Sequence, residues 1–276
     1  MSINGTLSPA PHILTTDDLR RMAPSIFATE PYHGVSENYR FLPTSNVLDI
    51  LRDRGYFPVK AMQSTTRLPD KQPFTKHLVR LRHADHLTPQ HIGAELPELI
   101  VCNSHDRTSA YRFMAGVFRL VCSNGMVVAS ADFGSISVKH SGAKDLEERV
   151  IDATYKIVEE TPRVAEQIEA WKQVSLTAPQ QLAFATAALE IRDGTAAIDA
   201  KAILAPRRSE DRPNADGTRD LWKTMNVAQE ALTQGGVRGR SQSGRRMTTR
   251  PIKAVDADIR TNRALWRLAD EMAKLV

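Results

Sequence analysis

Apolar and polar residues alternate along much of the first half of the chain, from Tyr56 to Ser141. Segments with this period of two are 57–64, 76–83, 96–103, 117–122, 126–129 and 134–140. Asn124-Gly125 lies between two of these segments and is typical of a tight hairpin turn, because both residues tolerate positive φ. The pattern therefore predicts a mainly antiparallel sheet.

A short region before the sheet carries helix and strand signals. Thr16 is the expected cap of a short first helix, and residues 39–42 are typical of a strand. Ser45 is expected to cap a second helix, which should stop at Gly55.

The apolar period lengthens to that of helices after Gly142. Helical patterns run from Leu146 to Trp171 with a break at Pro162, and then over 179–192, 220–234 and 256–275. Trp171, Trp222 and Trp266 occupy apolar positions of these patterns, which predicts that they are core residues. Residues 206–218 and 235–250 are predicted to be loops by composition.

These elements predict an α+β fold, with a mainly antiparallel sheet in the N-terminal half and a largely helical C-terminal half. We expect a polar lead-in over 1–35, a sheet region over 36–142, and a helical region over 143–276 that forms one compact unit with the sheet. At 276 residues, with 41% hydrophobic and 25% charged residues, the chain can bury a core unaided.

The sequence carries no membrane or export signal. No apolar run approaches the roughly 20 residues of a transmembrane helix. Residues 1–14 lack the basic start and apolar stretch of a signal peptide. We therefore expect a cytoplasmic protein with no membrane partner.

The two cysteines, Cys102 and Cys122, lie in apolar runs and not in the spacing of metal ligands. We expect both thiols to be buried, reduced and unliganded.

The most basic stretch lies between Leu232 and Pro251. It interleaves four glycines with Arg238, Arg240, Arg245, Arg246 and Arg250, and no acidic residue occurs between Glu230 and Asp256. Glycines let backbone amides approach a phosphate, and arginines form bidentate bonds to its oxygens. The chain's net charge of +5 is compatible with a polyanionic ligand. The stretch predicts a phosphate contact but does not match a P-loop, and a solvated basic loop is the alternative.

A second basic feature is the strand over 76–83, which sends Lys76, Arg80 and Arg82 to one face. If Arg119 shares that face, the sheet offers a basic platform for a nucleic-acid backbone, with Tyr111 or Phe113 available to stack on a base. An ordinary solvated sheet face is the alternative.

Candidate catalytic groups occur where two predicted strands end. His105 and Asp106 follow one strand and His140 closes another, and these residue types can form a metal site or an acid/base pair. Their spacing matches no known motif, and a turn whose side chains cap backbone groups is the alternative. We predict no metal and no cofactor, and leave the catalytic residues unassigned.

Six strings resemble the phage, prophage and plasmid family called domain of unknown function 932. They are Ser36–Thr44, Thr75–Arg82, Leu99–Asp106, Phe118–Gly125, Gly235-Gly236 and Asn262–Trp266. Arg107 departs from the family, which carries Asp-Gly at this turn. The resemblance implies a mobile-element setting and supplies no activity or catalytic residue.

Three functions remain open from the sequence. The first is an accessory protein that binds nucleic acid through its basic surface in element replication, recombination or protection, with DNA preferred to RNA although no residue pattern separates them. The second is a metal-dependent phosphodiesterase or other hydrolase using His105, Asp106 and His140. The third is an antagonist that binds a host or element-encoded protein. We do not expect an enzyme, and the sequence does not fix the oligomeric state.

Overall fold

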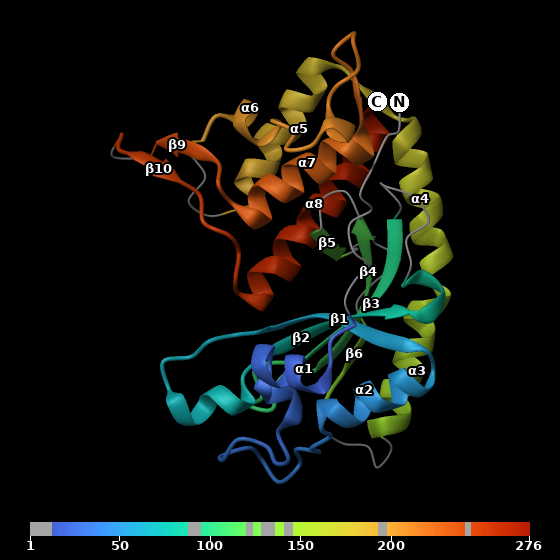
Figure 1. Ribbon diagram of the computed structural model, residues 1–276, viewed down its shortest axis with the longest axis vertical. Coiled ribbons are helices and arrows are strands. Elements are labelled where there is room, and N and C mark those ends of the chain that lie inside the picture. Colours follow the sequence, from blue (N-terminus) through green and yellow to red (C-terminus); the bar gives the residue numbers. More distant parts are fainter. Residues whose placement is uncertain are drawn as a thin grey trace, which may run out of the picture. The chain divides into compact units, whose positions relative to one another are not determined.

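A computed structural model of the chain describes residues 13–87, 95–119, 124–127, 136–140, 146–192, 198–240 and 244–276 (Figure 1). Its contacts group the chain into two compact units. Unit 1 comprises Met1–Gly125 with Ser135–Glu159, and unit 2 comprises Met126–Gly134 with Glu160–Val276.

Unit 1 is built around an antiparallel sheet. Its strands are β1 (Tyr56–Gln63), β2 (His77–His83), β3 (Glu95–Asn103), β4 (Tyr111–Arg119) and β6 (Ile136–Val138). Strand β5 (Asn124–Val127) begins in unit 1, and its last two residues belong to unit 2. They pair in the order β1-β2-β3-β4-β5, and β6 also pairs with β4. Its α-helices are α1 (Thr16–Met22), α2 (Thr44–Asp53) and α3 (Leu146–Glu159), with 3-10 turns at Pro24–Phe27, Pro69–Phe74 and Ala84–His86.

The strand register assigns different side chains to the two faces of this sheet. One face is apolar except near one end and carries His77, Val79, Leu81, Asn103, Val101 and Leu99 from β2 and β3. The other face carries Arg80 and Arg82 of β2 beside Ile100 and Glu98 of β3. Both faces are buried along β2 and β3, since Leu78, Arg80, Arg82 and Ile100 of the second face are at most 2% exposed.

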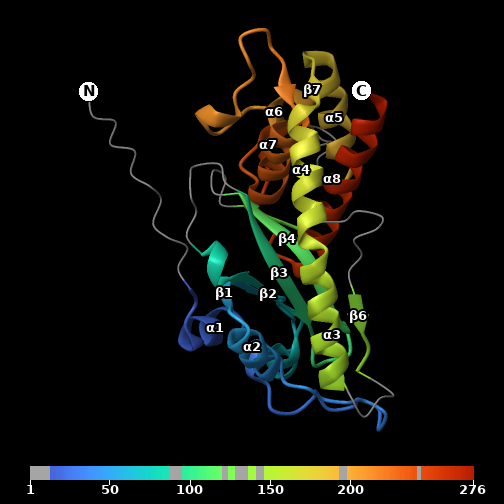
Figure 2. The same ribbon diagram turned by 90° about the vertical axis from the view of Figure 1, so that its right-hand side faces the viewer.

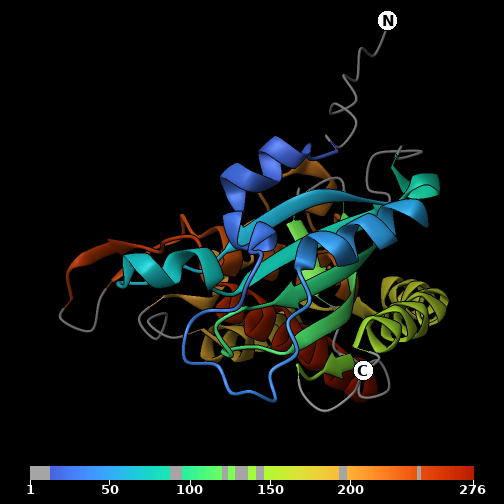
Figure 3. The ribbon, with the colours of Figure 1, turned by 90° about the horizontal axis from the view of Figure 1, so that it is seen from below.

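Helices α1 and α2 pack over the strand β1 side of the sheet (Figure 3). Helix α2 buries Val47, Leu48 and Leu51, and it ends before Gly55, whose φ of +82° a residue with a side chain adopts only with strain. Helix α3 contacts β4 and β6, and a small groove between α2 and α3 is lined by apolar residues of both. The core of unit 1 therefore lies between these helices and the sheet.

Unit 2 is mainly helical, with short strand pairs and a turn between its helices. Its helices are α4 (Thr161–Gln173), α5 (Ala178–Glu190), α6 (Ala200–Ile203), α7 (Leu221–Gln234) and α8 (Val255–Leu275). Strands β7 (Ser175–Leu176) and β8 (Arg219–Asp220) form one pair, β9 (Arg238–Arg240) and β10 (Arg246–Thr248) form another, and a 3-10 turn spans Ser209–Asp211.

Three tryptophans form the centre of unit 2. Trp171 of α4, Trp222 of α7 and Trp266 of α8 are each at most 2% exposed, and their ring centroids are 4.6 to 6.4 Å apart. Helix α7 contacts both α4 and α8 (Figure 2). Aromatic pairs in this range gain roughly 0.5–1.5 kcal/mol beyond area burial. The prediction that all three are core residues is confirmed.

The predicted α+β class is confirmed, and Cys102 is buried and forms no disulfide bond, as expected. Cys122 lies outside the described residues. No helix of the described residues combines the length and apolar character needed to cross a membrane.

Four local expectations were wrong. Thr15, not Thr16, caps α1 by accepting from the Asp18 amide. The predicted strand over 39–42 is reduced to a single bridge residue at Tyr39, and Ser45 lies inside α2, which begins one residue earlier. Asn124-Gly125 begins β5 and is not a turn between strands.

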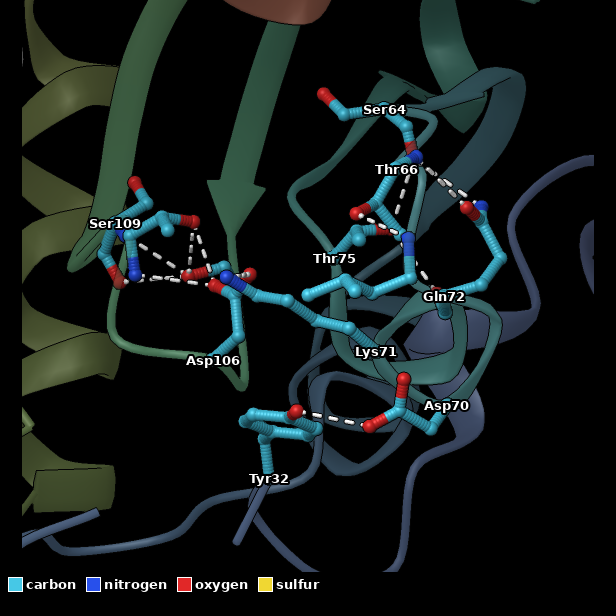
Figure 4. Close-up of polar contacts among 12 residues, drawn as sticks. Tyr32, Ser64, Thr66, Asp70, Lys71, Gln72, Thr75, Asp106 and Ser109 are labelled. Carbon is cyan, nitrogen blue, oxygen red and sulfur yellow. Dashed lines mark hydrogen bonds and ion pairs between the residues drawn. The ribbon is translucent and has the colours of Figure 1, made fainter. Parts of the chain in front are cut away.

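The turn after β3 contains a strained residue. Arg107 has φ of +67°, in the left-handed region that residues with side chains rarely adopt. Beside it, Asp106 accepts from the Thr108 amide at 3.0 Å and forms an ion pair with Lys71 at 3.3 Å (Figure 4). The Asp106 side chain thus caps a backbone amide of the turn, which is the alternative to a catalytic role. The strained backbone of the turn lies at Arg107.

We predict that Arg107→Gly unfolds with a free energy about 1 kcal/mol higher than Arg107→Ala, because glycine adopts positive φ without strain. The alanine variant is the matched control, since both changes remove the same side-chain contact to the Gly34 carbonyl. Urea unfolding of both variants measures the difference. An alanine variant at least as stable as the glycine variant would contradict the strain.

Candidate nucleic-acid interface

Two glycines position a hairpin at the end of α7. Gly235 and Gly236 have φ of +69° and +80°, and a Cβ on Gly235 would lie 2.6 Å from the Thr249 carbonyl oxygen. The close approach lets the Gly236 amide donate to that oxygen at 2.8 Å, while the Val237 amide donates to the Thr249 hydroxyl at 3.0 Å. The two ends of the hairpin are therefore bonded together at its base.

Strands β9 and β10 above this base carry arginines on one face. Arg240 stands directly opposite Arg246, and Arg238 stands opposite Thr248, so all four side chains point the same way. All four are exposed, whereas Gly239 and Met247 on the other face are half-buried. We call this set, Arg238, Arg240, Arg246 and Thr248, the arginine face.

The hairpin extends away from α5, α7 and α8 of unit 2 (Figure 1). Near its turn, the carbonyl oxygen of Gly244 accepts from the Arg240 guanidinium at 3.0 Å. Residues 241–243 lie outside the described residues. The expectation that 235–250 is a loop was wrong for 238–240 and 246–248, because three alternating residues in each strand are too few to show a period of two in the sequence.

Two further arginines fix the hairpin to the C-terminus of α7. The Arg192 guanidinium donates to the carbonyl oxygens of Leu232 and Arg250, and the Arg207 guanidinium donates to that of Gly235. Cations favour helix C-termini, where carbonyls lack helical partners. Burial lowers the pKa of Arg192 from its usual value. Sequence reasoning missed both residues, because they lie far from the basic stretch.

The remaining arginines of the stretch, Arg245 and Arg250, are also exposed. Six cationic side chains and no carboxylate occur between residues 231 and 255. The local field along this hairpin is therefore positive, and guanidiniums at the surface can reach phosphate oxygens or base edges.

The cations of the sheet have a different environment. Arg80 and Arg82 share one carboxylate, that of Glu98, at 2.8 and 2.9 Å, and all three side chains are at most 2% exposed. The Arg82 guanidinium also stacks 3.9 Å from the Phe118 ring centroid, and burial lowers its pKa. Arg80 and Arg82 are therefore not exposed as the expected basic platform requires, because both are internal ion-pair partners of Glu98.

Arg119 and Lys76 do not provide an exposed basic surface on the sheet either. Arg119 stands opposite Glu95 at the end of β4, on the face opposite to Arg80 and Arg82, and it is 5% exposed. Lys76 is 9% exposed. Tyr111 is fully buried, so its ring is not exposed for the expected stacking on a base.

His77, His105 and Asn103 meet Thr44 in a buried polar network of unit 1. The Thr44 hydroxyl oxygen lies 2.8 Å from His77 Nε2 and 3.3 Å from His105 Nε2, and it accepts from the Asn103 amide at 3.1 Å. All four residues are fully buried. Sequence reasoning missed Thr44 and His77, although a histidine on a strand face otherwise occupied by valine and leucine is the signal of a buried polar network.

One set of protonation states satisfies these contacts. A hydroxyl carries one proton and two acceptor sites, so Thr44 can donate to His77 while it accepts from Asn103 and His105. His77 Nδ1 then donates to the Thr75 carbonyl at 3.2 Å. His105 Nδ1 is buried with no hydrogen-bond partner in the structure. Both imidazoles are neutral in this arrangement.

His140 extends the network to the segment before α2. Its Nε2 lies 2.7 Å from the Asn103 side-chain oxygen, its Nδ1 lies 3.2 Å from the Arg40 carbonyl, and the Tyr39 ring stacks on it at 4.7 Å. Tyr111 donates to the Leu42 carbonyl at 2.8 Å. The network therefore ties the segment Tyr39–Thr44 to the end of the sheet.

The three candidate catalytic residues have separate partners. His140 contacts Asn103, His105 contacts Thr44, and Asp106 is directed to Lys71 and Thr108. Burial opposes ionisation of Asp106, but the hydrogen bonds from Thr108 and Ser104 and the contact with Lys71 outweigh it, so its pKa is lowered. Within the described ranges, no group of three or more His, Cys, Asp or Glu residues is arranged to hold a metal ion.

Burial also determines the charge state of the histidines. It lowers the pKa of His77 to about 4 and that of His105 to about 2, and it lowers the pKa of His140. The unfolded value is about 6.5, so the unfolded chain binds more protons than the folded one below this pH. Their contribution to stability is complete above pH 6.5 and is lost as the pH falls toward the folded values.

We predict that the free energy of unfolding decreases as the pH is lowered from 7 to 5, by on the order of 2 kcal/mol for each of His77 and His105. Denaturant titrations followed by circular dichroism measure it. His140→Gln should reduce the pH dependence, because burial lowers the pKa of His140. A free energy of unfolding that is flat over this range would contradict neutral buried histidines.

Comparison with known proteins places the chain in a family. Residues 31–266 match the family model described as Domain of unknown function (DUF932). Two proteins of Escherichia coli (strain K12), UPF0380 protein YafZ and UPF0380 protein YfjQ, are each 38% identical over 261 residues, which cover 94% of this chain and 91% of each relative. No solved structure matches significantly. The chain therefore belongs to the DUF932 family, as the resemblance of its sequence motifs implied.

Proposed function

We propose that this protein binds nucleic acid through the arginine face of hairpin β9–β10, as an accessory protein of a mobile element. The observation that carries the proposal is the alignment of three exposed arginines, Arg238, Arg240 and Arg246, on one side of a two-stranded ribbon. Arginine forks bind phosphate oxygens and the acceptor atoms of bases in bidentate geometry.

The rigid base of the hairpin supports this function. Arg192 and Arg207 hold the ends of the hairpin to the last turn of α7. A binding group on a fixed element loses less conformational entropy when its ligand binds than one on an open loop. The hairpin is therefore a preorganised cationic surface.

The buried cations of the sheet favour the hairpin over the sheet as the contact surface. Moving Arg80 and Arg82 to phosphates would leave Glu98 buried without a counter-charge, and breaking a buried pair costs about 3–5 kcal/mol. The side chains of the arginine face are exposed, so turning them toward a ligand leaves no buried charge behind. The mobile-element setting rests on the family resemblance alone.

We predict that Arg240→Ala/Arg246→Ala weakens binding to a nucleic-acid fragment by about tenfold or more at low salt and flattens the dependence of affinity on salt, because fewer counterions are released. Fluorescence anisotropy with a labelled fragment at several salt concentrations measures both quantities. The free energy of unfolding should change little, since both side chains are exposed.

The charge-matched control is Arg163→Ala/Arg267→Ala, which removes two exposed arginines from α4 and α8. It should bind nearly as tightly as the parent. Equal losses of affinity in the two double variants would indicate that net charge alone controls binding. This result would contradict the proposal that the hairpin is the binding surface.

A further inference from the structure

The described surface of residues 160–276 lacks the exposed aromatic rings that bind single strands. Residues 160–276 contain four aromatic side chains, Trp171, Phe184, Trp222 and Trp266, and each is at most 2% exposed. Proteins that bind single strands without sequence preference stack the bases on exposed aromatic rings. The described surface around the arginine face offers cations and no such ring.

The shape of the hairpin fits one nucleic-acid groove. Two paired strands lie about 4.8 Å apart, and with side chains the ribbon fits the major groove of B-form DNA, which is about 12 Å wide. The major groove of A-form RNA is deep and narrow, so side chains cannot read it. The minor groove of B-form DNA, about 6 Å wide, admits single arms and not a ribbon laid flat.

The chemistry of the arginine face matches base edges. Guanidiniums bind the O6 and N7 acceptors of guanine in pairs, and a threonine methyl group contacts the thymine methyl group. Arg238, Arg240, Arg246 and Thr248 place three such forks and one such methyl group on the same side. Arg250 is exposed at the base of the hairpin and can contact the flanking backbone.

From these observations we propose that the ligand is double-stranded DNA and that hairpin β9–β10 enters its major groove with the arginine face toward the base pairs. This inference rests on the proposed function and adds the class of nucleic acid, the groove and the direction of the face. The half-buried Gly239 and Met247 then point away from the bases.

The first experiment compares binding of the full chain to three fragments of equal length: a DNA duplex, its single strand and the corresponding RNA duplex. The DNA duplex is expected to bind at least about tenfold more tightly than the other two. Equal or tighter binding of the single strand or the RNA duplex would overturn this inference while leaving the proposed function intact. Absence of binding to all three would overturn both.

The second experiment tests the groove with modified duplexes. The probe is a duplex enriched from a random-sequence pool by the parent protein. Replacing its guanines with 7-deazaguanine removes the N7 acceptors of the major groove and should weaken binding by about tenfold for each bidentate arginine–guanine pair that it disrupts. Replacing them with inosine removes only the minor-groove amino group and should leave affinity nearly unchanged. The reverse pattern, or failure to enrich any sequence, would overturn the major-groove assignment.

A variant that keeps the charge separates reading of bases from attraction to phosphates. Arg238→Lys/Arg240→Lys/Arg246→Lys retains three cations but lacks the planar fork. It should bind a random duplex within about threefold of the parent, because the charge is conserved. It should lose the preference for the enriched duplex. A lysine variant that keeps this preference would contradict base reading by the arginine face.

Discussion

A charged side chain is stable inside a protein only when a counter-charge is buried with it, and this constraint decides which arginines of this chain can meet a ligand. Glu98 lies between Arg80 and Arg82 and is 1% exposed at its side chain. Its ion pairs hold both guanidinium groups inside the protein, although the sequence alone suggests that they are available to a ligand. No carboxylate occurs near the hairpin in sequence, and its arginines remain on the surface.

The same constraint acts on the histidines of unit 1. Removed from solvent, His77 and His105 lower the cost of burial by staying neutral and by sharing the Thr44 hydroxyl. Residues that the sequence suggests for catalysis, His105 and His140, thus hold the segment Tyr39–Thr44 against the sheet. These polar groups of unit 1 are buried, whereas the arginine face belongs to unit 2 and is exposed.

Much of the fold could be predicted from the sequence, because period-two and helical patterns are long enough to be unambiguous in β2, β3, α7 and α8. The two faces of β2 were also predictable, since alternation alone separates Arg80 from Val79. The burial of Arg80 and Arg82 was not predictable, because it depends on Glu98 of the neighbouring strand and on whether their face of the sheet is covered. Likewise, the basic stretch was visible in composition, but the common direction of Arg238, Arg240 and Arg246 requires the register of a hairpin three residues long on each side.

The most direct measurement is backbone hydrogen–deuterium exchange of the full chain with and without duplex DNA. If the hairpin is the contact surface, peptides covering residues 235–250 should exchange more slowly in the complex, because bound DNA excludes solvent and restrains β9 and β10. Peptides of β2 and β3, which carry Arg80, Arg82 and Glu98, should exchange at the same rate in both states. Slower exchange confined to β2 and β3, with the hairpin unchanged, would contradict the assignment of the binding surface to the arginine face.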